Sequence, residues 1–262
     1  MGGRLPKVSV VVITYNRLIT LRPTIASFLR HTDYPRELLE LILTDDGSPE
    51  AVQSELRRLP FDKFCLSKKR SGLGANTNRG LEAATADFIL HLQDDWECCG
   101  PSDYLRKAVS ILQARPDIGL LTLHRHDSLP TPTEVAEVEG ETLRIFSGIA
   151  DASEAASGRY AYSDRPHLKT RAFMGGMGRY NEKLNVAFTE VDFCRRFAGQ
   201  DRVALADLNG KAFFLNIGEE HSYNWPWKKR VESWITRLPG GEMAMRLYRR
   251  YKRGGARRVS EG

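Results

Sequence analysis

The sequence predicts an α/β fold in which a mostly parallel sheet is flanked by helices. Two observations predict it. Short apolar runs rich in β-branched residues alternate with segments of helical spacing. Each of the first four apolar runs is followed at once by polar residues. Strands that alternate with helices form parallel sheets, which bind ligands beyond the carboxyl ends of their strands.

The first 124 residues carry this alternation. Residues 7–14 are β-branched and apolar and predict a central strand. In the next segment Leu21, Ile25 and Phe28 share one helical face. The other strands are expected at 38–44, 61–66, 87–92 and 118–123. The helices are expected at 18–30, after the turn at 45–49, at 72–84 and at 104–114.

Beyond residue 124 the pattern changes. Residues 125–165 are rich in Pro, Thr, Ser, Glu and Ala and predict an insertion with a hairpin near 142–146. Residues 171–180 predict a glycine-rich loop. A helix is expected at 188–198, with short strands at 203–208 and 212–217. We therefore expect one domain over 1–222, with a ligand-binding part at 1–124 and a second part at 125–222, followed by a tail at 223–262.

Charge is concentrated in the tail. The net charge is +6, and residues 228–262 alone hold 11 Lys and Arg against three Glu, which leaves the rest near neutral. A near-neutral body does not favour nucleic-acid binding. There is no apolar segment of membrane-spanning length, no signal-like start and no Cys-x-x-Cys spacing. These features favour a cytoplasmic protein.

The tail itself has two interpretations. Val231, Trp234, Ile235 and Leu238 follow helical spacing, and arginines lie opposite the apolar face. A basic amphipathic helix of this kind suits an anionic membrane surface, which would place the protein on the inner face of the membrane. The alternative is a helix docked on the main domain with a solvated basic face. The sequence leaves both open.

Asp94 and Asp95 are the most informative pair of residues. They follow an apolar run that reads as a strand covered on both faces. Adjacent carboxylates at such a position repel each other, and a hard divalent cation would relieve the repulsion. Mg²⁺ and Mn²⁺ take oxygen ligands, and Mg²⁺ is held by one or two carboxylates together with substrate phosphates. The alternative is a pair of solvated acids in a loop.

Five motifs together resemble the inverting family 2 glycosyltransferases, which have the GT-A fold with a Rossmann-like sheet. They are Val-Val-Val-Ile-Thr-Tyr-Asn-Arg ending at Arg17, Asp-Asp-Gly-Ser from Asp45, Gly-x-x-x-Asn-x-Gly around Asn78, Gln-Asp-Asp from Gln93, and Thr-Glu-Val-Asp from Thr189. The resemblance covers roughly residues 7–222. It implies a C-terminal acceptor-side region after the nucleotide-binding part.

The resemblance implies roles for individual positions. Asp95 would bind Mn²⁺ or Mg²⁺, and His221 lies where related enzymes often place a metal ligand, although a surface histidine is an equal alternative. The donor-binding residues would be Thr14, Tyr15, Arg17, Asp45, Gly72, Asn78, Gln93 and Asp94. The acceptor side would include Met174, Gly175, Gly176 and Trp96, with core packing as the alternative for Trp96.

A carboxylate would act as the general base, and two candidates follow from the last motif. The family's usual pair is Glu-Asp with the Asp as base, whereas this chain has Thr189-Glu190. Glu190 therefore falls on the base position, and Asp192 is the second candidate. The alternative for both is favourable charge near a helix N-terminus.

The resemblance implies a metal-dependent inverting transfer from a nucleoside-diphosphate sugar to a hydroxyl of a glycan, polysaccharide or lipid-linked acceptor. Two other classes stay open. A nucleotidyltransferase would also use acids and Mg²⁺, but the stretch from Thr14 to Arg17 contains no glycine for a phosphate loop. A non-catalytic module that binds nucleic acid or membrane would rest on the basic tail alone.

Overall fold

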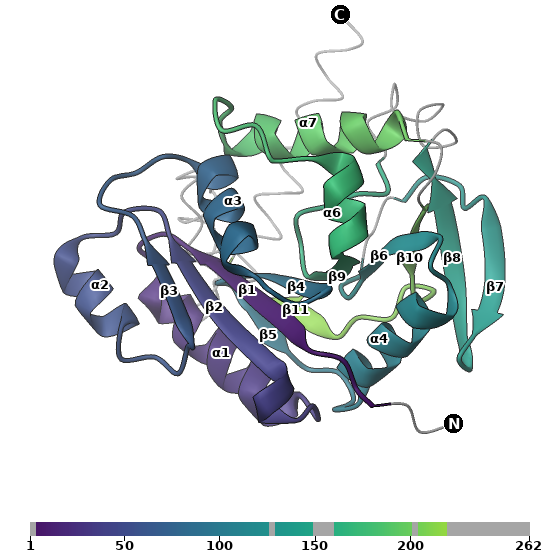
Figure 1. Cartoon of the computed structure of the whole chain (residues 1–262), viewed down its shortest axis with the longest axis horizontal. Helices are drawn as coiled ribbons and strands as arrows, with labels where there is room; N and C mark the ends of the chain where they lie inside the picture. Colours follow the sequence, from purple (N-terminus) through teal and green to yellow (C-terminus); the bar gives the residue numbers. More distant parts are fainter. Residues whose placement is uncertain (1–3, 126–128, 149–159, 201–203, 219–262) are drawn as a thin grey trace, which may run out of the picture. The chain divides into compact units, whose positions relative to one another are not determined.

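The computed structural model describes residues 4–125, 129–148, 160–200 and 204–218 (Figure 1). The chain divides into two compact units, Met1–Asn216 and Ile217–Gly262. The tail at 223–262 lies outside the described residues. In the part of the chain that is described, no helix combines the length and the apolar character needed to cross a bilayer.

A nine-stranded mixed sheet organises the first unit. β9 and β8 run opposite to the other strands, so most of the sheet shares one direction. From edge to edge the strands are β3 (Lys63–Leu66), β2 (Leu39–Asp45), β1 (Val8–Thr14), β4 (Phe88–Gln93), β9 (His167–Thr170), β6 (Ile118–Thr122), β10 (Ala204–Asp207), β8 (Glu141–Ser147) and β7 (Glu134–Val138). The predicted α/β class is confirmed.

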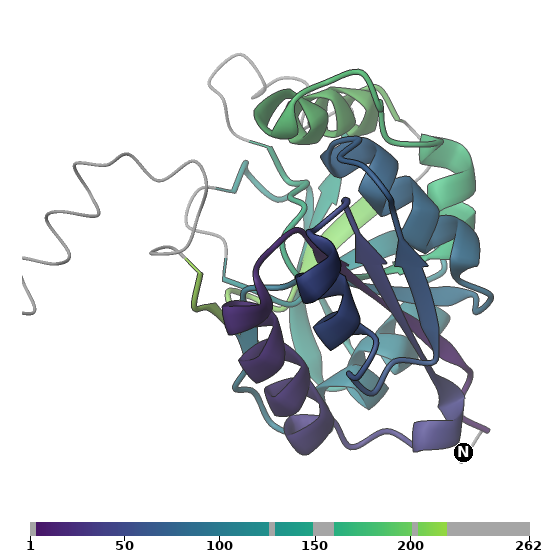
Figure 2. The same ribbon diagram turned by 90° about the vertical axis from the view of Figure 1, so that its left-hand side faces the viewer.

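Helices cover both faces because the central strands are apolar on both. In β1, Val8, Val10 and Val12 join the core under α1 (Leu18–His31) and α4 (Tyr104–Ala114). Val11 and Ile13 point the other way, into the core under α3 (Leu73–Ala83). This alternation follows from the two-residue period of a strand. Figures 1 and 2 show α1 and α3 on opposite sides of these strands.

Helix α3 lies unusually close to the sheet. A Cβ atom on Gly80 would lie 2.5 Å from Cγ1 of Val11 and 3.0 Å from Cγ2 of Thr44. Only glycine fits that approach without a shift of the helix. The last glycine of the Gly-x-x-x-Asn-x-Gly motif is therefore explained by the packing of helix on strand.

The remaining helices are α2 (Glu50–Leu56), the 3₁₀ turn η1 (Arg36–Leu38), α6 (Arg171–Met177) and α7 (Val186–Ala198). Of these, α6 corrects the prediction of a glycine-rich loop. Thr170 caps its first turn by accepting a hydrogen bond from Phe173 N at 3.1 Å, and Gly178 follows its end at φ 73°. Phe173 and Met177, four residues apart, form its buried side.

The expected hairpin exists, but its turn lies earlier than predicted. β7 and β8 pair in antiparallel fashion, and Glu139 and Gly140 connect them with φ values of 52° and 75°. Two positive φ values in a two-residue connection suit the right-handed twist of the strands. Residues 142–146, predicted as the hairpin, lie within β8.

A small second sheet follows the acidic pair. β5 (Trp96–Cys98) pairs with β11 (Phe214–Asn216) in antiparallel fashion. Phe213 N also donates to Leu123 O at 2.9 Å. The end of the first unit is thereby joined to the segment that directly follows Asp95.

Candidate functional site

Three neighbouring strands end side by side. Thr14 is in register with Asp45 at the ends of β1 and β2, and Ile13 is in register with Gln93 at the end of β4. Asp94 N then donates to Ile13 O at 3.1 Å, which continues the pairing one residue further. The polar clusters predicted at the strand ends therefore lie on one edge of the sheet.

Arg17 binds both acids of the pair. Its guanidinium lies 3.1 Å from Oδ1 of Asp94 and 2.9 Å from Oδ2 of Asp95. Thr14 donates its hydroxyl proton to Oδ2 of Asp94 at 2.7 Å. Burial raises the pKa of Asp94 to about 7, against the opposing effect of Arg17. Two buried acids are thus held together by one partly buried cation.

Asp95 has an oxygen suited to a metal ion. Its Oδ1 atom is buried, and no donor in the described part of the chain reaches it. A buried carboxylate oxygen without a partner is costly unless a cation or a water satisfies it. Among the residues described, no group of three or more His, Cys, Asp and Glu could hold a metal by itself. The donor set therefore fits a cation shared with a ligand's own oxygens, as Mg²⁺ commonly is.

The acids at the end of β2 are bound to protein groups. Asp45 accepts hydrogen bonds from the amide and hydroxyl of Ser48, the amide at 2.8 Å, and from Nε2 of Gln53 at 2.9 Å. Asp46 accepts from the amides of Ser71 at 2.8 Å and Gly72 at 3.0 Å. Asp45 thus closes its own turn, and Asp46 joins that turn to the loop before α3.

The loop before α3 brings further predicted residues to the edge. Gly72 directly precedes the first residue of α3. Its φ of 95° is a conformation that residues with an L side chain rarely adopt. In the same loop, the Arg70 guanidinium lies over the Tyr15 ring, 4.6 Å from its centroid. Arg79 of α3 reaches the Asp45 carbonyl oxygen at 3.3 Å. Arg70 and Arg79 therefore place positive charge near the carboxyl ends of the strands.

Asn78 connects two elements. Its Nδ2 donates to Tyr180 O at 2.9 Å and to Glu182 at 2.8 Å, and its Oδ1 accepts from Tyr180 N at 2.9 Å. These bonds attach α3 to the segment that leads into α7. The side-chain amide of Asn78 is thus bonded to protein groups. Its predicted contact with the sugar donor stays a prediction.

Gln93 and Trp96 contact each other. Nε1 of Trp96 donates to Oε1 of Gln93 at 3.2 Å. Trp96 is only 6% exposed, packs within the largest core cluster and lies against the His124 ring, 5.6 Å between centroids. The packing favours the core alternative for Trp96 over stacking on an acceptor.

The two candidate bases on α7 have different surroundings. Glu190 accepts hydrogen bonds at Oε1 from Ser163 Oγ at 2.9 Å and from Asp164 N at 3.0 Å. Asp192 instead forms an ion pair with Arg196, one turn further along, at 3.0 Å. α7 begins after Asn185, whose side chain accepts from Phe188 N. Glu190 is therefore held by the segment before β9, and Asp192 by its own helix.

The segment with Ser163 and Asp164 leads into β9, which pairs with the strand that ends before Asp94 and Asp95. His91 of β4 is in register with His167 of β9, and the two strands are antiparallel. Asp94 lies three residues after His91, and Asp164 lies three residues before His167. Because β9 is antiparallel to β4, the segment before β9 lies at the end of the sheet where β4 ends. Ser163, Asp164 and β9 were not predicted, because polar residues in a short segment after an insertion give no strand pattern.

The predicted acceptor-side residues lie on α6. Met174 is partly buried and packs against the cluster of Phe173, Phe193 and their neighbours. Gly175 and Gly176 are exposed, and a Cβ atom on either would meet nothing within 4 Å. His221 lies outside the described residues. The acceptor-side roles and the metal role of His221 stay predictions.

Buried histidines line the neighbouring strands. The rings of His91 and His167 stack with 4.7 Å between centroids, and both are almost fully buried. Burial lowers the pKa of both well below the ordinary value. His91 is therefore a packed core residue.

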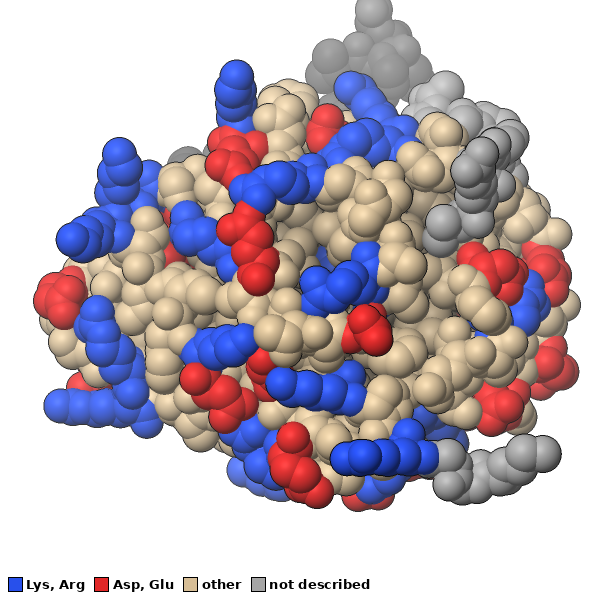
Figure 3. Space-filling view, viewed as in Figure 1, with Lys and Arg blue, Asp and Glu red and all other residues tan. Residues whose placement is uncertain are grey.

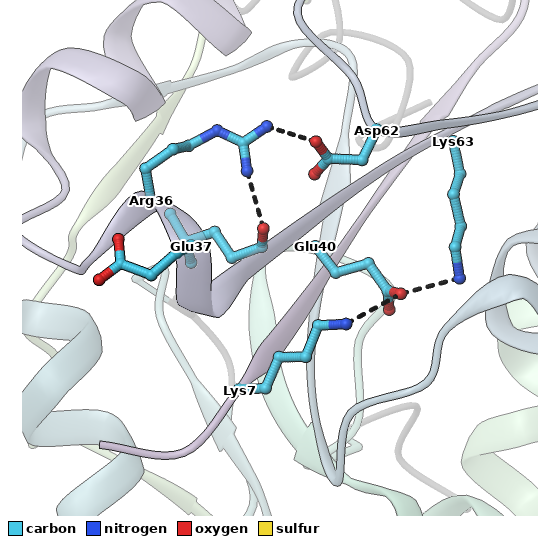
Figure 4. Close-up of a pocket in the computed structure, with 7 residues that line it drawn as sticks. Lys7, Arg36, Glu37, Glu40, Asp62 and Lys63 are labelled. Atoms are coloured by element: carbon cyan, nitrogen blue, oxygen red, sulfur yellow. Dashed lines mark hydrogen bonds and ion pairs between the residues drawn. The ribbon is translucent and has the colours of Figure 1, made fainter. Parts of the chain in front are cut away.

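A pocket at the opposite ends of the strands has another character. It measures about 310 Å³ and is lined by Lys7, Arg36, Glu37, Leu39, Glu40, Asp62 and Lys63 (Figure 4). Glu40 near the start of β2 binds Lys63 at 2.8 Å and Lys7 at 3.4 Å. Arg36 binds Asp62 at 2.6 Å. These charges compensate one another, so the pocket is an ion-pair cluster away from the carboxyl ends.

Comparison with curated proteins finds relatives of similar sequence. Over 149 residues the chain is 35% identical to GalNAc(5)-diNAcBac-PP-undecaprenol beta-1,3-glucosyltransferase of Campylobacter jejuni, across 55% of this chain and 43% of that protein. The chain spans less than half the length of the curated relatives it matches.

Two solved structures show the same fold at low identity. S. aureus TarS 1–349 in complex with UDP-GlcNAc has a TM-score of 0.59 and 19% identity, across 79% of this chain and 57% of that chain. The mannosyltransferase PcManGT of Pyrobaculum calidifontis, in complex with GDP-Man and Mn²⁺, has a TM-score of 0.50 and 19% identity, across 72% and 52%. The predicted GT-A fold is confirmed. Residues 9–208 match the family described as Glycosyl transferase family 2, and the chain belongs to that family.

Proposed function

We propose that this chain is a metal-dependent inverting glycosyltransferase that moves a sugar from a nucleoside-diphosphate sugar to an acceptor hydroxyl. One observation carries the proposal. Asp94 and Asp95, which Arg17 binds, lie on the same sheet edge as the segment that holds Glu190. A cation-binding acid and a separate carboxylate base are the two groups that such a transfer requires.

The donor's diphosphate would lie over the carboxyl ends of β1, β2 and β4. Thr14 and Arg17 orient the carboxylates of Asp94 and Asp95, and Arg70 adds positive charge beside Tyr15. Asp95 would hold Mn²⁺ or Mg²⁺ through its buried oxygen. A bound divalent ion stabilises the negative charge that develops on the leaving diphosphate.

Glu190 would remove the proton from the acceptor. Its Oε1 atom is held by Ser163 and Asp164, and no donor among the described residues contacts Oε2. As the acceptor oxygen forms its bond to the anomeric carbon, its proton passes to Oε2. The bond from that carbon to the phosphate oxygen breaks on the opposite face, so the configuration inverts.

Asp192 is the weaker candidate for the base. Its carboxylate is paired with Arg196, which also donates to the Met177 carbonyl oxygen. A base in an ion pair must give up that pairing when it takes a proton. The proposal therefore assigns Asp192 to holding Arg196 against the end of α6.

A glycan carried on a lipid diphosphate is the proposed acceptor class. The C. jejuni relative has a name that describes transfer to a glycan on undecaprenyl diphosphate. An acceptor in a membrane would suit a basic tail that binds anionic lipid, and residues 228–262 carry 11 Lys and Arg. Vesicle binding by the full chain and by a chain ending near residue 240 tests that tail.

Nucleic-acid binding has little support. On the face shown in Figure 3, basic and acidic side chains of the described residues are interspersed. Such a surface does not offer the basic stripe that phosphate backbones require. The family match also favours sugar transfer over nucleotidyl transfer.

The test measures sugar transfer to lipid-diphosphate-linked glycans from UDP-, GDP- and dTDP-sugars, with Mn²⁺ and with chelator. The proposal expects product only with a divalent ion and an inverted anomeric configuration. Glu190→Gln should lose about 10²-fold or more in kcat, with Asp192→Asn much less affected. Retention of configuration would contradict the proposal, and full activity of Glu190→Gln would contradict the assigned base.

A further inference from the structure

A cluster of buried polar side chains adjoins the segment that binds Glu190. The side chains of Tyr162, Asp164, Lys169 and Tyr180 are each at most 4% exposed. The Tyr162 hydroxyl donates to Asp164 and also contacts the Tyr180 hydroxyl, and Lys169 Nζ lies 3.5 Å from the Tyr180 hydroxyl oxygen. The family motifs quoted above contain none of these four residues.

The cluster is costly to bury. Lys169 lies on β9 between β4 and β6, in the middle of the sheet, where a lysine side chain is rare. Burial lowers the pKa of Lys169, and the charge of Asp164 opposes that shift. Burial also raises the pKa of Asp164, and repulsion from Glu190 raises it further. Removal of either charge would leave the other buried without compensation, which is strongly destabilising.

The cluster fixes the chain segment that touches Glu190. Asp164 is anchored through its carboxylate to Tyr162 and by charge to Lys169, while its backbone N–H points at Oε1 of Glu190. Ser163 adds its hydroxyl to the same oxygen. Two donors on one oxygen restrict the rotation of the carboxylate and leave Oε2 for the acceptor hydroxyl.

We propose that Ser163 is a positioning residue for Glu190, and that the buried Asp164–Lys169 pair holds the segment that presents it. The inference rests on the proposed function, since it requires Glu190 to be the base. A reacting group displaced by about 1 Å can cost about 10²-fold in rate. Ser163 therefore acts on turnover and leaves donor binding unchanged.

A matched control exists at the other end of the sheet. Ser9 donates its hydroxyl proton to Glu40, so Ser9 and Ser163 are both buried serines that donate to a glutamate. Ser9→Ala removes the same kind of bond near the start of β1, far from the carboxyl ends of the strands, together with the hydrogen bonds that Ser9 Oγ accepts from the amides of Thr85 and Ala86. A purely structural role for Ser163 predicts the same result for both variants.

The experiment compares Ser163→Ala, Ser163→Thr, Ser9→Ala and Glu190→Gln in the full chain, measuring kcat, the donor KM and Tm. We expect Ser163→Ala to lower kcat about 10-fold, less than Glu190→Gln does, with the donor KM unchanged. Ser163→Thr, which keeps the hydroxyl, should restore most of kcat. Ser9→Ala should lower Tm at least as much as Ser163→Ala does and keep kcat.

Three results would overturn the inference. They are an unchanged kcat in Ser163→Ala, no recovery in Ser163→Thr, or an equal loss of kcat in Ser9→Ala. These differ from failure of the proposed function, in which wild type transfers no sugar or Glu190→Gln keeps full activity. An inactive Glu190→Gln beside a fully active Ser163→Ala would overturn the positioning role alone.

Discussion

Thr14 donates its hydroxyl proton to Asp94 across the β1–β4 pair at 2.7 Å, and this bond fixes an acid whose burial opposes its charge. Asp94 is 3% exposed, and burial raises its pKa to about 7 from an ordinary value near 3.8. An ionised Asp94 therefore costs stability, as functional acids often do.

Asp94→Asn should stabilise the protein at pH 8 in the absence of nucleotide and metal. Because the folded pKa is raised, the contribution of Asp94 is most favourable below the unfolded pKa and is lost as the pH rises through about 7. The gain should be about 1 kcal/mol or more at pH 8 and should shrink toward pH 4. Urea unfolding across this range measures it. A variant less stable than wild type at pH 8 would show that Asp94 is stabilising when charged.

Glu40→Gln should destabilise the protein at neutral pH. Burial opposes the charge of Glu40, but hydrogen bonds from Lys63, Ser9 and Thr85 outweigh it and lower the pKa to about 2. The stability from this lowered pKa is present above about 4.5 and is lost as the pH falls toward 2. We expect a loss of about 1–3 kcal/mol at pH 7.

Glu37→Gln is the control, because Glu37 lines the same pocket on an exposed position (Figure 4). It should change the free energy of unfolding by less than about 0.5 kcal/mol. Equal losses in the two variants would remove the special role of Glu40.

Lys169→Met should destabilise the fold strongly, because it leaves the Asp164 carboxylate buried without its cation. The expected loss is about 3–5 kcal/mol. The double variant Asp164→Asn/Lys169→Met should recover much of it, since the uncompensated charge is gone. Chemical denaturation of all four members of the cycle measures the coupling. Additive losses would mean that the two side chains do not compensate each other.

Asn78→Ala should lower stability and leave the donor KM unchanged. Its amide is bonded to Tyr180 and Glu182, so its removal detaches the segment before α7 from α3. The expected loss is about 1–3 kcal/mol. A raised donor KM with unchanged Tm would instead support the donor contact that the family resemblance implies.

The sequence predicted the part of the fold that is built from long apolar strands. The apolar runs of β1, β2 and β4 are long enough to predict, and the acids at their ends meet as expected. β9 was missed because His167 and Lys169 are polar residues in a strand of four. α6 was missed because Gly175 and Gly176 hide the spacing of Phe173 and Met177. The support of Glu190 depends on β9, so periodicity could not reveal it.

The most direct test of the central claim is calorimetric binding of UDP, GDP and dTDP with and without Mn²⁺, to wild type, Asp95→Asn and Asp62→Asn. The acid at the end of β4 should bind the metal, whereas Asp62 lies in the ion-pair cluster before β3. We expect one nucleotide to bind only with Mn²⁺, in wild type and Asp62→Asn alike, and Asp95→Asn to lose that binding. Metal-independent binding, or equal binding by Asp95→Asn, would contradict the account.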